Sequence, residues 1–191
     1  MKTIDQIYQA KIEVKKSIFL AFLCPYKDFK NLLKELKSEH LKAVHFVYAY
    51  RYLNDFKQIV EDKSDDGEPK GSSAMPCLNV LRGAFLVDCA VIVIRYFGGI
   101  KLGVGGLVRA YSEATNFVIL NAKLLEFELK QTLNLCIPFA VYSRFEYFLN
   151  KNNINFEKKF TECVELKIYV NEKEEKDFKN FAKEFEIVNF T

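Results

Sequence analysis

Five of the eight glycines in this chain fall within residues 98–106, and this cluster constrains the fold more than any other feature of the sequence. The cluster follows Ala90–Ile94, an apolar run typical of a strand, and leads into an amphipathic helix pattern from Leu107 onwards. Glycine reaches positive φ and lets the backbone pass close to another surface, so a sharp strand-to-helix connection is predicted. We call this segment the glycine loop; its glycines are Gly98, Gly99, Gly103, Gly105 and Gly106.

The glycine loop has the features of an anion site. A strand, a loop and a helix N-terminus together direct free N–H groups and the positive end of a helix dipole towards one point. Three cations, Arg95, Lys101 and Arg109, flank the loop. Neither a Walker loop nor a dinucleotide-binding fingerprint fits, because no glycine precedes a lysine and Val108 stands where a third glycine belongs. The alternative is a tight corner made for packing alone.

Composition favours an ordinary globular protein. Half of the 191 residues are hydrophobic, the first residues lack the apolar core of a signal peptide, and no apolar run is long enough to cross a bilayer. We therefore expect a cytoplasmic protein without membrane contact. The five cysteines are odd in number and form no C-x-x-C pair, and there are only two histidines. Buried reduced thiols are expected, with no metal and no other cofactor.

The elements predict an α+β chain of two domains, residues 1–125 and 126–191, joined at Lys123–Leu129. The second domain reads as βαββαβ, the order of a ferredoxin-like sandwich. Its strands are expected at Thr132–Pro138, Ile154–Phe160, Val164–Val170 and Glu186–Phe190, and its helices at Tyr142–Lys151 and Glu172–Lys183. The first domain mixes strands at Ile7–Val14, Ser17–Pro25, Val44–Tyr52 and Gln58–Asp62 with helices at Lys27–His40 and Met75–Leu81.

Basic residues are concentrated in the first domain. Residues 1–125 hold 18 Lys and Arg against 13 Asp and Glu, whereas residues 126–191 hold 10 against 12. The overall charge of +3 is too mild to demand nucleic acid. The uneven distribution of charge places the basic surface in the same half as the glycine loop.

A second unusual segment, Ser64–Pro76, begins with three acidic residues in five positions: Asp65, Asp66 and Glu68. Such residues can bind a divalent cation, but an EF-hand is rejected because Ser73 stands where a carboxylate is needed. Asp, Gly and Pro also form ordinary turns. Two further alternatives stay open: Arg95 pairs with one of these carboxylates, and Ser73 caps the helix that follows.

Three motifs together resemble the IMPACT/YigZ family. They are Ala43-x-His45-x-x-Tyr48-Ala49-Tyr50-Arg51, Ser64-Asp-Asp-Gly-Glu-Pro-x-Gly71 and Arg95-Tyr-Phe-Gly-Gly-x-Lys-Leu-Gly-x-Gly-Gly-Leu-x-Arg109-Ala-Tyr111. Lys15-Lys16-Ser17-x-Phe19 matches as well. The family reads Gly-Thr-Ala-Gly-x-Pro where this chain has Gly71-Ser-Ser-Ala-Met-Pro76, so Ala74 replaces a glycine.

The resemblance implies a fold and a role in translation. The first domain is expected to resemble domain four of elongation factor G, a small-subunit ribosomal protein and GHMP kinases. The second is expected to resemble domain five of elongation factor G. Eukaryotic members of the family regulate translation by competing for the activator of an initiation-factor kinase. They carry a different partner domain, so that interaction does not transfer to this chain.

The leading hypothesis is an RNA- or ribosome-associated protein that regulates translation and binds an anionic ligand at the glycine loop. The anion-binding candidates are Arg95, Gly98, Gly99, Lys101, Gly103, Gly105, Gly106 and Arg109. A neighbouring site loop is expected to add His45, Arg51, Asp65, Asp66, Glu68 and Lys70. No catalytic residue is assigned. The alternatives are an enzyme acting on a small phosphorylated substrate, with an acidic residue as base or metal ligand, and a protein-interaction module.

Overall fold

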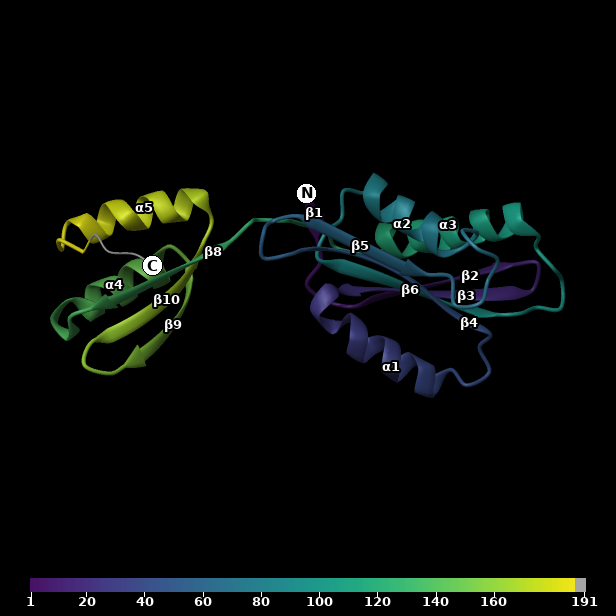
Figure 1. The fold of residues 1–191 in the computed structure, drawn as a ribbon, viewed down its shortest axis with the longest axis horizontal. Helices are drawn as coiled ribbons and strands as arrows, with labels where there is room; N and C mark the ends of the chain where they lie inside the picture. The colour runs from purple at the N-terminus through teal and green to yellow at the C-terminus, as the bar shows by residue number, and fades with distance from the viewer. Residues whose placement is uncertain (188–191) are drawn as a thin grey trace. The chain divides into compact units, whose positions relative to one another are not determined.

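The computed structural model describes residues 1–187 and divides into two compact units, Met1–Phe127 (unit 1) and Glu128–Thr191 (unit 2). Both units mix helices and strands, so the chain is a two-unit α/β protein (Figure 1). None of the helices in the described part is long and apolar enough to cross a bilayer.

Unit 1 is built on a five-stranded antiparallel sheet in the order β2-β3-β6-β4-β5. The strands are β2 Tyr8–Val14, β3 Ser17–Pro25, β4 His45–Leu53, β5 Ile59–Ser64 and β6 Cys89–Tyr96. Helices α2 (Ala74–Gly83) and α3 (Val104–Leu120) cover one face, and α1 (Phe29–Glu39), after the short 3-10 turn η1 (Tyr26–Asp28), covers the other (Figure 1). Central strand β6 consists almost entirely of apolar residues, as expected for a strand with both faces buried.

A second, two-stranded sheet pairs β1 (Lys2–Thr3) with β7 (Leu125–Glu126). It was not predicted, because two residues are too short to show any periodicity. It joins the two ends of unit 1 and occupies part of the segment expected to be the linker. Independent folding of the two units stays a prediction.

Unit 2 follows the predicted order over its described residues. It contains β8 Gln131–Ile137, α4 Phe139–Lys151, β9 Asn155–Phe160, β10 Val164–Val170 and α5 Glu172–Lys183. The antiparallel sheet has the order β8-β10-β9, and its inward residues pack with both helices in one core. Residues 188–190 of the last predicted strand lie outside the described residues.

The expectation of buried reduced thiols is wrong for two of the five cysteines. Cys136 and Cys163 form a disulfide, and Cys136 is exposed. The reason is the alternation of β8: Leu135 and Ile137 face the core, so Cys136 between them faces outwards. Cys24, Cys77 and Cys89 are free and buried, as expected.

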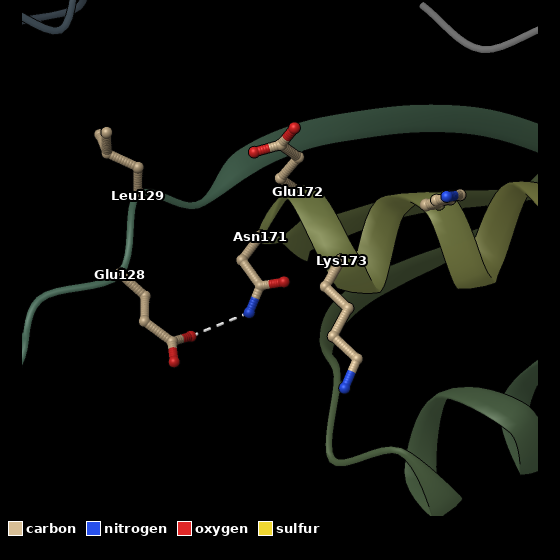
Figure 2. A pocket seen from close by; sticks show the side chains of 6 residues that line it. Glu128, Leu129, Asn171, Glu172 and Lys173 are labelled. Carbon is tan, nitrogen blue, oxygen red and sulfur yellow. Dashed lines mark hydrogen bonds between the residues drawn. The ribbon is translucent and has the colours of Figure 1, made fainter.

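The start of α5 lies beside a hollow of about 590 Å³ in unit 2 (Figure 2). Asn171 caps the helix in a capping box with Glu174. The Asn171 side-chain amide also donates a hydrogen bond to Glu128 at 2.9 Å. Asn171, at the edge of the hollow, is therefore bonded to side chains of its own unit.

Candidate functional site

The glycine loop packs against the β2–β3 turn. Gly98 N–H donates to the Ser17 hydroxyl at 3.2 Å, and a Cβ added to Gly98 would lie 2.0 Å from the carbonyl carbon of Lys16. Only glycine fits there, because the neighbour is backbone. Lys15 and Lys16 form the two-residue turn with φ of 47° and 66°, and both residues are exposed. Neither lysine was among the predicted site residues, although both stand in a quoted motif.

Two further glycines turn the chain into α3. Gly99 and Gly103 have φ of 83° and 71°. Gly103 is the N-cap residue, and among the described residues no side chain caps the helix. The first helical N–H groups therefore stay available to an external acceptor. Gly105 and Gly106 lie inside the first turn, and Gly106 packs against Leu102.

Exposed apolar and cationic side chains share this region. Phe97, Ile100 and Val104 are 49%, 44% and 61% exposed. Lys101 is exposed in the loop itself, and Arg109 is exposed in the second turn of α3. We define the glycine-loop surface as six residues from the β2–β3 turn and from the segment 97–104. They are Lys15, Lys16, Phe97, Ile100, Lys101 and Val104.

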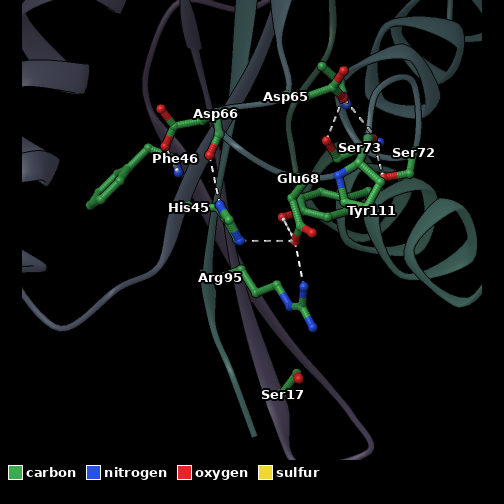
Figure 3. A network of polar contacts seen from close by, with 12 residues as sticks. Ser17, His45, Phe46, Asp65, Asp66, Glu68, Ser72, Ser73, Arg95 and Tyr111 are labelled. Atoms are coloured by element: carbon green, nitrogen blue, oxygen red, sulfur yellow. Dashed lines mark hydrogen bonds and ion pairs between the residues drawn. The ribbon is translucent and has the colours of Figure 1, made fainter. Parts of the chain in front are cut away.

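Arg95 lies beneath this surface rather than on it. Its Nη1 donates to Glu68 Oε1 at 2.6 Å, and both side chains are buried (Figure 3). Tyr111 O–H donates to the same oxygen at 3.0 Å. Burial, and then the Glu68 carboxylate, raises the pKa of Tyr111, which keeps the phenol protonated as a donor. The alternative in which Arg95 pairs with an acidic residue of the second segment is confirmed, with Glu68 as the partner.

The Arg95 guanidinium also lies between two rings. Its Cζ is 5.6 Å from the Phe19 ring centroid and 5.7 Å from that of Phe97. Among the described residues, its buried Nε has no hydrogen-bond partner. Arg95 thus connects the buried Glu68 carboxylate to exposed Phe97, a structural link between the acidic segment and the glycine-loop surface.

The two aspartates of the acidic segment, Ser64–Pro76, accept hydrogen bonds from backbone N–H groups. Asp65 accepts hydrogen bonds from the Ser73 hydroxyl at 2.6 Å and from the N–H groups of Gly71 and Ala74 at 2.8 Å each. Asp65, rather than the Ser73 side chain, therefore caps α2. Burial alone would raise the pKa of Asp65, but these hydrogen bonds outweigh it and lower the pKa.

Asp66 connects the same segment to β4. Its carboxylate accepts from Phe46 N–H at 2.6 Å, and its carbonyl oxygen accepts from His45 Nδ1 at 2.7 Å (Figure 3). His45 Nε2 then lies 3.9 Å from Glu68 Oε1. His45, Asp65, Asp66 and Glu68 are thus brought together, with Glu68 alone bonded to Arg95. Among the described residues, no cluster of three or more His, Cys, Asp or Glu is placed to hold a metal ion.

Arg51 and Lys70 do not join this network. Arg51 lies near the far end of β4 from His45, where its Nε pairs with Glu61 at 2.7 Å and its Nη1 donates to the Leu86 carbonyl at 2.6 Å. Arg82 binds the same Glu61 carboxylate. Lys70 is exposed in the loop before α2. Arg51 therefore fixes the opposite end of the sheet.

Comparison with known proteins agrees with the motifs. Residues 15–119 match the Impact N-terminal domain family. The chain is 30% identical over 186 residues to the IMPACT family member YvyE of Bacillus subtilis (strain 168), covering 95% of this chain and 85% of that protein. It is 37% identical over 109 residues to the IMPACT family member YigZ of Escherichia coli (strain K12), which is 54% of this chain and 52% of YigZ. A crystal structure titled only as that of a hypothetical protein has the same fold, with a TM-score of 0.73 at 24% identity over 100% of this chain and 94% of that one. The chain belongs to the IMPACT family.

Proposed function

We propose that this protein is an RNA-binding regulator of translation that contacts RNA through the glycine-loop surface. The observation that carries the proposal is the packing of Gly98 on the Lys15–Lys16 turn. That contact brings the backbone of the lysine turn against the loop that contains Lys101 and leads to the uncapped start of α3. Cations and free N–H groups bind phosphates, which hold a nucleic acid in place without reading its sequence.

The apolar part of the surface suits single-stranded RNA. Unpaired bases stack on exposed aromatic rings, and Phe97 is a half-exposed ring backed by Arg95. Because Arg95 is buried against Glu68, we assign it the positioning of Phe97. The phosphate contacts are assigned to the three lysines of the glycine-loop surface and, outside that surface, to exposed Arg109 in α3. Membership of the IMPACT family, whose eukaryotic members regulate translation, supports translation as the setting, with the ribosome as a partner.

The enzyme alternative has less support from the geometry. A general base or metal ligand needs a carboxylate that is free to act. Asp65 and Asp66 are bonded to backbone N–H groups, and Glu68 is bonded to Arg95 and Tyr111. The carboxylates of this segment therefore support the loop structure.

The test is RNA binding by the full chain, measured as fluorescence anisotropy of a labelled single-stranded RNA at low salt. We expect the double variant Lys16→Glu/Lys101→Glu to bind several-fold more weakly, whatever the RNA sequence, because phosphate contacts are lost. The matched control is Lys30→Glu/Lys34→Glu on α1, which makes the same change of charge on exposed residues of the opposite face.

Equal weakening by both double variants would show that general positive charge, rather than this surface, drives binding. Absence of binding by the folded wild-type protein at low salt would refute the proposal itself. In that case inorganic phosphate and small phosphorylated compounds become the next ligands to test.

A further inference from the structure

Two cysteines distant in sequence meet at the outer face of the unit 2 sheet. Cys136 lies on β8, and Cys163 lies in the turn between β9 and β10, 27 residues later. Their Cα atoms are 6.0 Å apart, within the range that a disulfide spans without backbone movement. Cys136 is exposed and Cys163 is half-buried, so reagents from solvent reach the pair.

The other three cysteines are shielded from solvent. Cys24, Cys77 and Cys89 are fully buried in unit 1. Burial raises the pKa of each of these thiols to about 12. A buried thiol with a raised pKa holds little of the reactive thiolate, so these three act as packing residues.

Cys136 lies in an exposed and charged part of the outer sheet face. It lines a shallow hollow of about 530 Å³ on the outer sheet face. The charged residues that line the hollow are Glu157, Lys158, Lys159, Glu165 and Lys167. Both glutamates accept an O–H hydrogen bond from a neighbouring side chain, and Lys158 is paired with Glu146. Glu165 lies directly opposite Cys136 in the β8–β10 ladder, and in the β9–β10 ladder Lys159 lies opposite Glu165 and Lys167 opposite Glu157, so charges of both signs surround the cysteine.

We propose that Cys136 and Cys163 form a reversible dithiol–disulfide site that reacts with small-molecule disulfides. The site is independent of RNA binding. In the oxidising direction, the Cys136 thiolate attacks one sulfur of the small disulfide, which forms a mixed disulfide and releases the first small thiolate. The Cys163 thiolate then attacks Cys136 Sγ, which closes the protein disulfide and releases the second small thiolate. The two cysteine protons pass to the released thiolates, so the protein loses two hydrogens and the small disulfide becomes two thiols.

Closure has a defined structural effect. The bond ties the β9–β10 turn to the neighbouring strand β8, across a loop of 27 residues. It restricts the unfolded state and fixes one rim of the hollow. Reduction frees that turn while the ladder between β8 and β10 holds the sheet together.

The experiment uses the full chain, reduced with dithiothreitol, freed of reductant and pulsed under native conditions with iodoacetamide before peptide mass mapping. Cys136 should be alkylated at least about tenfold faster than each of the three buried cysteines. After incubation with oxidised glutathione, labelling of Cys136 and Cys163 should disappear together. The intact mass should then be that of the dithiol less two hydrogens, with no glutathione attached.

A variant distinguishes this site from a merely exposed cysteine. In Cys163→Ser the second step is missing, so Cys136 should retain glutathione as a mixed disulfide. Retention of glutathione by the wild-type protein, formation of disulfide-linked dimers, or equal alkylation of Cys24, Cys77 and Cys89 under native conditions would each overturn the proposal.

Discussion

Replacing Gly98 with alanine should destabilise unit 1 more than any other single methyl added within the glycine loop. The new Cβ would lie 2.0 Å and 2.2 Å from the carbonyl carbon and oxygen of Lys16, and 2.4 Å from Ser17 N. Ordinary van der Waals contact begins near 3.4 Å, so the backbone must separate by about 1.4 Å. Overpacking costs typically 1–3 kcal/mol, and no flexible side chain is available here to absorb it. We therefore expect a loss of about 3 kcal/mol.

Urea unfolding of the full chain, followed by circular dichroism, measures this loss. With an m-value of about 1–3 kcal/mol/M, the midpoint of the unit 1 transition should fall by about 1–3 M. Gly105→Ala is the matched control, since no described atom outside the local helix lies within 4 Å of its added Cβ. It should leave stability unchanged or raise it by up to about 1 kcal/mol, because alanine favours the helix. An unchanged midpoint for Gly98→Ala, or an equal fall for Gly105→Ala, would refute the close approach of loop and turn.

Three further outcomes are expected. Glu68→Ala should cost unit 1 about 3–5 kcal/mol in urea unfolding, because it leaves the Arg95 charge buried and unpaired, and Glu68→Leu/Arg95→Met should recover much of that loss. Asp65→Ala should cost about 0.5–2 kcal/mol at pH 7 through loss of the α2 cap. Because the folded pKa of Asp65 is lowered, its contribution is complete above the unfolded pKa of about 3.9. The difference in free energy of unfolding between wild type and variant should therefore shrink as the pH falls below about 4 through the folded pKa. A difference that is constant down to pH 2 would contradict the assignment. Phe97→Ala should weaken RNA binding in the anisotropy assay by about 1–3 kcal/mol if one base stacks on the ring, and unchanged affinity would remove Phe97 from the surface.

Much of the fold was predictable because its elements carry strong local periodicity. β8 alternates Leu133, Leu135 and Ile137 inwards, and the structure places this strand within one residue of the predicted ends. The same alternation already implied that Cys136 points outwards, and the cysteine expectation failed because composition was read without it. By contrast, β1 and β7 form through pairing between the two ends of unit 1, which no local pattern records.

The candidate site was predicted at the level of segments and not of individual contacts. The acidic segment and the glycine loop do meet, through Glu68 and Arg95. Three carboxylates within four positions look equivalent in sequence. Their roles are set by a turn in which Asp66 and Gly67 have φ of 44° and 87°. Those backbone angles determine which of the three carboxylates points into the protein. The location of Lys15 and Lys16 beside the loop depends on sheet pairing between β3 and β6, a long-range contact.

The most direct test of the central claim is the salt dependence of RNA affinity. For single-stranded RNA, the slope of log affinity against log salt is about −0.7 for each phosphate contacted. If Lys16 and Lys101 each contact one phosphate, Lys16→Glu/Lys101→Glu should reduce the magnitude of the slope by about 1.4, whereas Lys30→Glu/Lys34→Glu should leave it unchanged. A slope that is the same in wild type and in the Lys16→Glu/Lys101→Glu variant would contradict RNA binding through the glycine-loop surface.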